Sequence, residues 1–428
     1  MKAKKVLGIL LSVAMLSTAI VGCGKSEEPK KEPDKKQEQS GDFTKADGPI
    51  IYWSMWDAGS KTAEAIQAAV DDYCEASGNE VKIEWKGRDI QTLIGASIDA
   101  GEDIDIYEDD YQRLSTTFAD YALDLENMAQ EAGYYEKSNE ALTSAAKGWA
   151  GTLKCIPYQS YASGVVYNKA IFKEVGVKEP KTWDEFLDVC EKIKKAGYNP
   201  LTLDGAYTTM NLGYHLARYI GQEGVKDVVN NGKWAETPEV LKMAQDMENL
   251  VKKGYFSEYA PASFPEGENE IGFDETAMVI NASWVADEIT NNTGCDLEWG
   301  MFSYPAVTGG VDGTEGMMVG GQGMSINKNS KNAQAAFELI MYLTTGKGDA
   351  EVSKASNAIP ADPANGEWPE IIKDFKSAFE QATKGYEWAC GMECEAEMTP
   401  VIQEWGNKLF GGECTAQEFV DGLEAASK

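Results

Sequence analysis

Two short segments of the sequence place aromatic rings beside carboxylates. Trp56 and Asp57 follow one apolar run, and Asp109, Asp110 and Tyr111 follow another. A flat ring can cover the C–H face of a bound molecule, and carboxylate oxygens accept hydrogen bonds from its hydroxyl groups. These residue types therefore favour recognition of a neutral, hydroxyl-rich molecule. As alternatives, Trp56 could belong to the core, Asp57 could cap a helix, and the acids at 109–110 could form a solvated turn.

Bond-breaking and metal chemistry have few candidate residues. His215 is the only histidine, which excludes Ser-His-Asp and Cys-His schemes unless His215 itself is the base, and excludes His-rich metal sites. Cys390 and Cys394 could pair with each other, but they lack the second ligand pair that a structural zinc site needs. The acidic run that begins at Glu102 lacks the spacing of a calcium loop. We expect no metal, no cofactor and no catalytic residue.

The elements that must position the aromatic and acidic segments can be predicted from hydrophobic spacing. Strands are expected at 50–53, 81–85 and 104–107, separated by helices that run from Ser60 to Gly78 and from Asp89 to Gly101. Strand, helix, strand, helix, strand is typical of a parallel sheet covered by helices. Ligands of such sheets bind beyond the carboxyl ends of the strands. Both segments are expected at such ends.

The rest of the chain continues in the same style. Further strands are expected at 165–167, 201–203, 277–280 and 324–326, with helices at 183–196, capped by Thr182, and at 332–344, and a mainly helical tail at 368–427. About 400 residues are too many for one hydrophobic core, so two lobes are expected. The fold class is therefore α/β.

The first 22 residues have the pattern of an export signal. Three of the first five residues are lysines, and the apolar run at 6–16 is too short to span a bilayer. Residues 20–23 resemble a bacterial lipobox, which implies cleavage after residues 1–22 and lipid on Cys23. The polar segment that follows predicts a disordered tether at 23–48. The alternative is a signal without lipidation.

The overall charge limits the classes of partner that the chain can bind, and the cysteine content indicates the state of its thiols. The net charge is −31, which argues against nucleic acid and other polyanions as partners. Of the eight cysteines, setting Cys23 aside leaves an odd number, which is a poor disulfide framework and indicates several free thiols.

Five stretches, taken in order, resemble the extracellular solute-binding proteins of bacterial carbohydrate ABC transporters, a family that includes maltose-binding protein. The stretches are 50–56, 156–158 with 164–172, 180–186, 275–284 and 320–328. Each stretch is a weak match by itself, but the five stretches in this order cover nearly the whole chain after the predicted signal. The sequence departs from the family at Asp274, where glycine is usual, and at 282–283, where Gly-Pro or Gly-Ser is common.

The resemblance implies a two-lobed periplasmic-binding-protein-like fold (type II), with each lobe a mainly parallel sheet flanked by helices. Lobes of this kind close over ligand by hinge motion, and periplasmic binding proteins are a standard example of such closure. The expected N-terminal lobe is 49–158 plus 325–348, and the expected C-terminal lobe is 159–324 plus 349–428. Hinge crossings are expected near 158–164, 320–325 and 346–353.

The resemblance also points to ligand contacts beyond the first two segments. Trp284 stands at the place of a family stacking tryptophan. The other expected ligand residues are Tyr158 and Gln159 at a crossing, Gly320, Gly321 and Gln322 in a loop, Asp204 after a strand, and Trp388, with Tyr386 beside it, in the tail. A tryptophan in a helical tail is more often part of the core, and the glycine loop could be a plain bulge.

The function implied is capture of a sugar or oligosaccharide and its delivery to the permease of an ABC transporter. We expect a monomer held by lipid on Cys23 at the outer face of a cytoplasmic membrane. The long tether favours a Gram-positive cell, with a Gram-negative periplasm as the alternative. Other possibilities are a sensor for a membrane kinase, a binder of a non-sugar such as a peptide, or a surface glycosidase that uses Asp109 or Asp110 with a distant Glu.

Overall fold

The computed structural model describes residues 43–428. The predicted signal at 1–22, Cys23 and most of the tether at 23–48 lie outside the described residues. The described residues belong to one compact unit. Within them, no helix combines the length and the apolar character needed to cross a bilayer.

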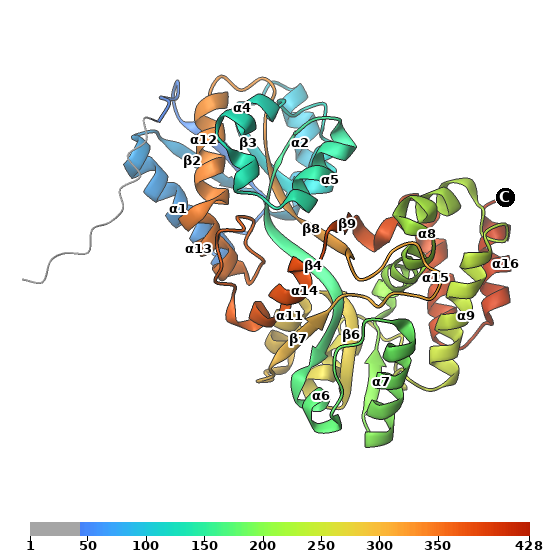
Figure 1. Cartoon of the computed structure of the whole chain (residues 1–428). Coiled ribbons are helices and arrows are strands. Elements are labelled where there is room, and N and C mark those ends of the chain that lie inside the picture. The colour runs from blue at the N-terminus through green and yellow to red at the C-terminus, as the bar shows by residue number, and fades with distance from the viewer. Residues whose placement is uncertain (1–42) are drawn as a thin grey trace, which may run out of the picture. The chain divides into compact units, whose positions relative to one another are not determined.

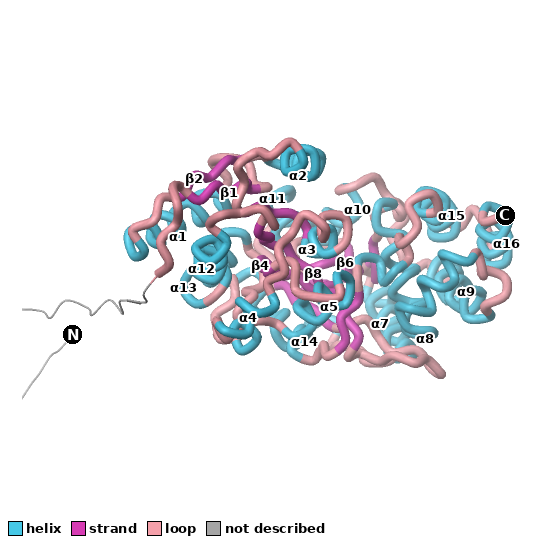
Figure 2. Tube along the Cα trace, turned by 90° about the horizontal axis from the view of Figure 1, so that it is seen from above, coloured by secondary structure: helices cyan, strands magenta, loops and turns pink. Residues whose placement is uncertain are grey.

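Nine strands of the described chain form one mixed sheet, with helices on both sides of it (Figures 1 and 2). The order is β2-β1-β3-β8-β4-β6-β5, with β7 beside β4 and β9 beside β8. The strands are β1 Ile50–Ser54, β2 Val81–Trp85, β3 Ile106–Asp110, β4 Ile156–Asn168, β5 Asn199–Thr202, β6 Thr276–Ala282, β7 Trp299–Phe302, β8 Gly316–Ile326 and β9 Lys384–Tyr386. β1 pairs in parallel with β2 and β3, and β5 with β6, whereas β4 is antiparallel to β6, β7 and β8. The predicted α/β class is confirmed.

Strands β4 and β8 are the longest, and they pair along the middle of the sheet (Figure 1). Their pairing shifts register between Tyr158 and Tyr161, where Gln159 has a φ of 46°. Beyond this irregularity, β4 pairs with β6 and β7. The hinge crossings expected near 158–164 and 320–325 coincide with this part of the ladder, and motion there stays a prediction.

The third crossing was expected near 346–353, which lies in helix α13, Gly346–Ser356. This helix contacts α1 and α12, and the chain then passes Ile359, which pairs with Ser160. Contact with β7 begins at the short helix Glu370–Phe375. The predicted lobe boundaries remain predictions.

The helices begin and end where local sequence signals are strongest. They are α1 Lys61–Ser77, α2 Ile90–Asp99, α3 Tyr111–Ser115, α4 Glu126–Glu131, α5 Glu140–Ala150, α6 Lys169–Val175, α7 Trp183–Ala196, α8 Thr208–Asn231, α9 Pro238–Lys252, α10 Glu266–Asn269, α11 Val285–Thr293, α12 Ala333–Thr344, α13, α14 Lys376–Glu380, α15 Thr399–Phe410 and α16 Ala416–Ala426. Ser60 caps α1 and Thr182 forms a capping box on α7, as predicted. The tail is mainly helical, with β9 as the exception.

The third strand does not lie where the apolar run predicted it. It was expected at 104–107 but spans Ile106–Asp110. The carboxylate of Asp105 instead accepts a hydrogen bond from the backbone of Ile51, and pairing with β8 continues as far as Asp110. Asp274, where the family usually has glycine, adopts the left-handed φ of 60° that glycine would favour.

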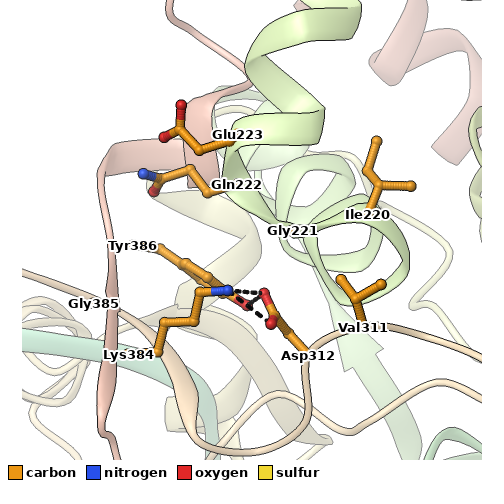
Figure 3. Close-up of a pocket in the computed structure, with 9 residues that line it drawn as sticks. All are labelled: Ile220, Gly221, Gln222, Glu223, Val311, Asp312, Lys384, Gly385 and Tyr386. Carbon is orange, nitrogen blue, oxygen red and sulfur yellow. Dashed lines mark hydrogen bonds and ion pairs between the residues drawn. The ribbon is translucent and has the colours of Figure 1, made fainter.

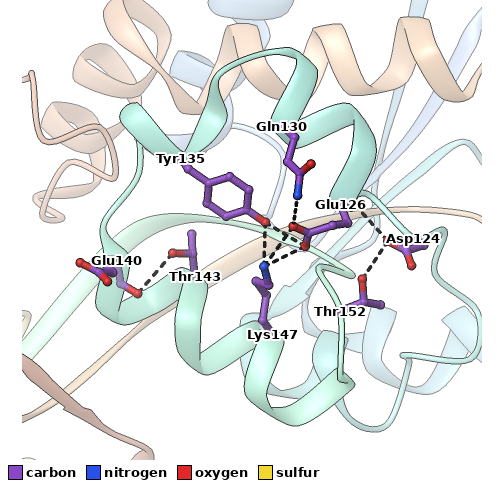
Figure 4. Close-up of polar contacts among 8 residues, drawn as sticks. All are labelled: Asp124, Glu126, Gln130, Tyr135, Glu140, Thr143, Lys147 and Thr152. Carbon is purple, nitrogen blue, oxygen red and sulfur yellow. Dashed lines mark hydrogen bonds and ion pairs between the residues drawn. The ribbon is translucent and has the colours of Figure 1, made fainter.

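Three hydrophobic clusters fill the interior. One is built mainly from α7, α8, α9, α15 and α16, a second from α1, α12 and their strands, and a third from α2, α3, α5 and α11 packed against strands of the sheet. Polar contacts join the shorter helices: Lys147 on α5 donates to Glu126 on α4 and to Tyr135 (Figure 4). Packed helices thus cover the sheet on both sides.

Arg218, on α8, is fully buried and holds three segments together. Its guanidinium donates to the carbonyl oxygens of Tyr304 at 2.8 Å and Gly316 at 2.7 Å, and to the hydroxyl of Tyr386 at 3.2 Å. His215 lies one turn earlier, fully buried between the Tyr304 hydroxyl and Asp246. Burial lowers the pKa of His215, and the side chain is part of the core.

Arg218→Met is expected to lower the free energy of unfolding by about 3 kcal/mol, because the carbonyls of Tyr304, Pro305 and Gly316 lose a buried donor. Urea unfolding measures the change. Lys192→Met is the control, because Lys192 pairs with Asp188 at the surface and should change stability by less than about 1 kcal/mol. Equal stability of the two variants would contradict the structural role of Arg218.

Candidate functional site

Five aromatic rings from five separate segments form a continuous row. Trp284 stacks on Trp388 with centroids 6.0 Å apart and planes 22° apart, and meets Tyr161 edge-on at 4.8 Å. Trp388 contacts Tyr207 at 6.4 Å, and Tyr207 contacts Phe264 at 6.0 Å. We call these five residues the aromatic row. Four of the rings are half-buried, and Phe264 is 51% exposed, so ring surface remains available to a ligand.

Trp388 is held by a turn of unusual backbone conformation. Ala389, Cys390 and Gly391 all have positive φ, at 49°, 52° and 87°. The turn packs so closely on α8 that a Cβ at Gly213 would lie 1.9 Å from the carbonyl oxygen of Ala389. Non-glycine residues in the left-handed region are costly and persist where the surroundings fix them. The surroundings therefore fix the position of Trp388.

Glu387, immediately before Trp388, connects the aromatic row to the end of β3. One carboxylate oxygen accepts a hydrogen bond from Gln112 on α3 at 3.1 Å, and the other lies 3.1 Å from the ammonium of Lys226. The backbone N–H of Glu387 donates to Gln222 on α8. Helix α3 starts directly after β3, so Glu387 connects the segment that carries Trp388 to the predicted acidic segment at 109–111.

Trp56 and Tyr158 meet at a buried carboxylate. The indole N–H of Trp56 donates to the Tyr158 hydroxyl at 2.8 Å, and that hydroxyl donates to Glu108 at 2.8 Å. Glu108 also accepts from Ser54 and is fully buried, which raises its pKa. The ring of Trp56 is half-buried, with the Arg88 guanidinium 5.3 Å from its centroid. Trp56 is thus oriented from the edge and partly covered by a cation.

The remaining acids that the sequence selected are engaged by protein groups. Asp109 is buried and bonds Arg113 through both oxygens, at 2.8 and 3.0 Å. Asp110 caps α3, and Asp204 is buried and accepts from two backbone N–H groups of the α10 turn. Asp57 is exposed and lies against Gly87.

The residues predicted at the β4–β8 crossing lie together, but largely against each other. The ring of Tyr161 fills the space beside Gly320, and the carbonyl of Tyr158 fills the space beside Gly321. The Tyr111 hydroxyl is buried and donates to the carbonyl of Val319. By contrast, the buried amide groups of Gln159, through Nε2, and of Gln322, through Oε1, have no partner among the described residues. Such groups call for an explanation, and ligand contact is one.

Sequence reasoning missed several residues of the site. They are Tyr161, Tyr207, Phe264, Glu268, Glu288 and Glu387. Two of them had a local signal, because Tyr207 follows Asp204 in the same turn and Glu387 precedes Trp388. The others are brought in by long-range packing.

A separate hollow of about 330 Å³ lies beside the segment that carries Trp388 (Figure 3). It is lined by Ile220, Gly221, Gln222, Glu223, Val311, Asp312, Lys384, Gly385 and Tyr386. The lysine that lines this hollow is already paired, because the ammonium of Lys384 lies 2.8 Å from both carboxylate oxygens of Asp312. None of its lining residues belongs to the aromatic row. We therefore assign it no ligand.

The described chain contains free thiols and no cluster of metal-ligand side chains. All seven cysteines between residues 43 and 428 are free, including buried Cys390 and exposed Cys394, so the expectation of free thiols is confirmed. Within the same range, no three His, Cys, Asp or Glu side chains gather as a metal ion would need.

The fold and the aromatic row define a class of protein, and a family model agrees. The model for bacterial extracellular solute-binding proteins matches residues 59–350, and the chain belongs to this family. The predicted family and the type II two-lobed fold are confirmed.

Relatives of this chain include named sugar-binding proteins. A multiple sugar-binding protein of Streptococcus mutans is 23% identical over 364 residues, which cover 81% of this chain and 80% of that protein. The diacetylchitobiose binding protein DasA of Streptomyces coelicolor is 25% identical over 422 residues, covering 95% and 90%. Among solved structures, apo RafE of Streptococcus pneumoniae superposes with a TM-score of 0.72 at 18% identity, covering 90% of this chain and 98% of RafE.

Asp109→Asn tests whether this acid supports the fold or touches ligand. We expect the free energy of unfolding to fall by about 1 to 2 kcal/mol, because the buried carboxylate of Asp109 loses its charge-assisted contact with Arg113, whose side chain is 40% exposed to solvent. Ligand affinity should change less than about threefold, well under the tenfold that 1.4 kcal/mol would give. Urea unfolding and a binding titration measure the two quantities. Unchanged stability with lost affinity would make Asp109 a ligand residue.

Proposed function

We propose that this chain is a non-catalytic, extracytoplasmic binding protein that captures an oligosaccharide and delivers it to an ABC transporter permease. The observation that carries the proposal is the aromatic row. Its five rings extend over four successive contacts of 4.8 to 6.4 Å, which is more surface than one sugar ring covers. A ligand of several units therefore fits the site better than a monosaccharide.

Polar groups around the row suit hydroxyl recognition. The amides of Gln159 and Gln322 offer a buried donor and a buried acceptor without protein partners in the described chain. Buried polar groups of this kind are normally paired, and sugar hydroxyls can serve as both donor and acceptor. Trp56 and Asp57, which follow β1, and Asp110, at the end of β3, are proposed to contact the ligand from that side.

Relatives support the ligand class and the role. The names of two relatives specify sugars or diacetylchitobiose, and a structure of RafE contains raffinose. For this chain we propose a monomer, anchored through lipid on Cys23 at the outer face of the cytoplasmic membrane, with an ABC permease as its partner. A glycosidase is less well supported, because Asp109 is paired with Arg113 and Asp110 caps a helix.

The proposal is tested by thermal unfolding of the purified chain against raffinose, diacetylchitobiose, maltotriose and their monosaccharides, with product analysis of each hit. Ligand at about a thousand times its dissociation constant should add about 4 kcal/mol to the free energy of unfolding. An oligosaccharide should raise the midpoint and be recovered intact. Cleavage of the sugar would indicate an enzyme, and an unchanged midpoint with every one of these sugars would count against a sugar ligand.

Trp284→Ala is expected to weaken binding of the oligosaccharide identified above by about tenfold to a hundredfold. The reason is that Trp284 contacts two other rings of the row, Tyr161 and Trp388, and stacking of a sugar on it would contribute about 1.5 to 3 kcal/mol. Isothermal titration measures the affinity. Trp405→Ala is the control, since Trp405 is half-buried on α15 and packs on Gly422. If both variants bind as tightly as the parent, the row is not the ligand site.

A further inference from the structure

Two glutamates lie against each other beneath the aromatic row. Glu268 on α10 is fully buried, and Glu288 on α11 is half-buried and within hydrogen-bonding contact of it. Oε1 of Glu268 and Oε2 of Glu288 are buried and receive no hydrogen bond from any described group. The other oxygen of Glu268 accepts from the amide of Asn281 at 3.2 Å. Each glutamate thus presents one unsatisfied oxygen in a buried position.

The surroundings of the pair contain no compensating positive charge. Among residues 43–428, neither Glu268 nor Glu288 has a Lys, Arg or His nitrogen within ion-pair distance. The titratable groups on the elements around the pair are Asp204, Tyr207, Glu266, Glu270 and Asp287, together with Glu370, Lys373 and Asp374 on the short helix that contacts α11. Lys373 is the one base among them, and its ammonium pairs with Glu370. Two ionised carboxylates in this environment would repel and could not donate to each other.

A proton bound between the two carboxyl groups resolves both problems. A protonated carboxyl donates one hydrogen bond, so one proton would satisfy both oxygens and remove one of the two charges. Burial, together with the charges of Glu288 and Asp204, raises the pKa of Glu268 to about 9. Burial likewise raises the pKa of Glu288. The pair titrates as a unit.

The pair supports two rings of the aromatic row. Trp284 immediately precedes α11, and the backbone N–H of Glu288 donates to the carbonyl oxygen of Trp284 at 3.1 Å. Burial and the charges of Glu268 and Glu288 raise the pKa of Tyr207, whose hydroxyl also lies near the side chains of Trp284 and Asn281. A change in the charge of the pair would therefore act directly on Trp284 and Tyr207.

We propose that Glu268 and Glu288 share one proton, and that this proton holds α10 against α11 and positions Trp284 and Tyr207 for ligand. This inference rests on the proposed function for its ligand. Both glutamates act as positioning residues, because their unpaired oxygens are buried and they act through the two rings. Loss of the proton places two like charges in contact, so the rings shift and ligand affinity falls in alkaline solution.

The sign of the stability effect follows from the raised pKa. Between the ordinary carboxyl pKa of 4.5 and about 9, the folded chain holds a proton that the unfolded chain has released. The contribution of the pair to stability is therefore greatest below this window and falls as pH rises through it. Glu268→Gln should remove this slope, because an amide donates to Glu288 at every pH.

Infrared spectroscopy of the ligand-free full chain tests the proton itself. The parent should show the carbonyl stretch of a buried carboxylic acid at pH 7 that disappears by pH 10. Glu268→Gln and Glu288→Gln should each lack this band. Glu266→Gln, which changes an exposed acid on the same helix, should keep it. Absence of the band in the parent at pH 7 would overturn the proposal.

Tryptophan fluorescence tests the positioning role without any ligand. The emission of Trp284 is obtained as the difference between the chain and its Trp284→Phe variant. It should change between pH 7 and pH 10 in the parent and in Glu266→Gln, and stay constant in Glu268→Gln. A constant signal in the parent across a pH range that removes the infrared band would overturn the positioning role.

Binding of raffinose and diacetylchitobiose at pH 7 and pH 10 extends the test to the site. The sugar that binds should do so about tenfold more weakly at pH 10, which corresponds to a change of one unit in the pKa of the pair on binding. Glu268→Gln should bind equally at both pH values, and equal binding by the parent would overturn the link to ligand. If neither sugar binds, the proposed function is weakened, while the spectroscopic results still decide the proton and its effect on Trp284.

Discussion

The antiparallel pairing of β4 and β8 is the constraint on which the rest of the structure depends. β8 also pairs with β3 and β9, and β4 also pairs with β6 and β7, so every other strand except β1, β2 and β5 is attached directly to one of these two strands. Their register shifts where Tyr161 and the Tyr158 carbonyl fill the space left by Gly320 and Gly321. Larger residues at these glycines would separate the strands, so the same close approach that permits the pairing also fixes the position of Tyr161 at one end of the aromatic row.

The aromatic row is assembled from segments that are distant in sequence, and polar contacts hold some of its rings. Trp388 donates to Glu393 at 3.0 Å, Tyr207 contacts Asn281 and Trp284, and Glu387 joins the row to α3. Hydrophobic packing alone would allow rings to rotate, whereas directional hydrogen bonds select one orientation. The hydrogen bond from Trp388 to Glu393 therefore shows how a carboxylate can fix the orientation of a ring in the row.

Local features of the fold could be predicted from sequence, and long-range ones could not. The start of α1 at Ser60 and of α7 at Thr182 depends on side chains within three residues, so the capping signal was sufficient. Of the candidate site, Trp284 and Trp388 were predicted and lie in one stacked pair. Asp109 and Asp204 were predicted as ligand residues, but their partners, Arg113 and the α10 turn, are set by tertiary packing. The pairing of Glu268 with Glu288 could not be predicted from the residues around each, because it depends on the tertiary contact between α10 and α11.

Gly213 shows how the site limits redesign of the chain. A glycine in the middle of a helix normally invites replacement by alanine, a substitution that gains about 1 kcal/mol of helix propensity. In α8 the replacement would place a methyl group 1.9 Å from the Ala389 carbonyl and displace the turn that carries Trp388. A thermostability screen that scores helices one at a time would therefore select a more regular scaffold whose recognition surface is damaged. Gly213 leaves the space into which the turn at 389–391 packs. Substitutions that aim to raise the stability of α8 should therefore keep this glycine.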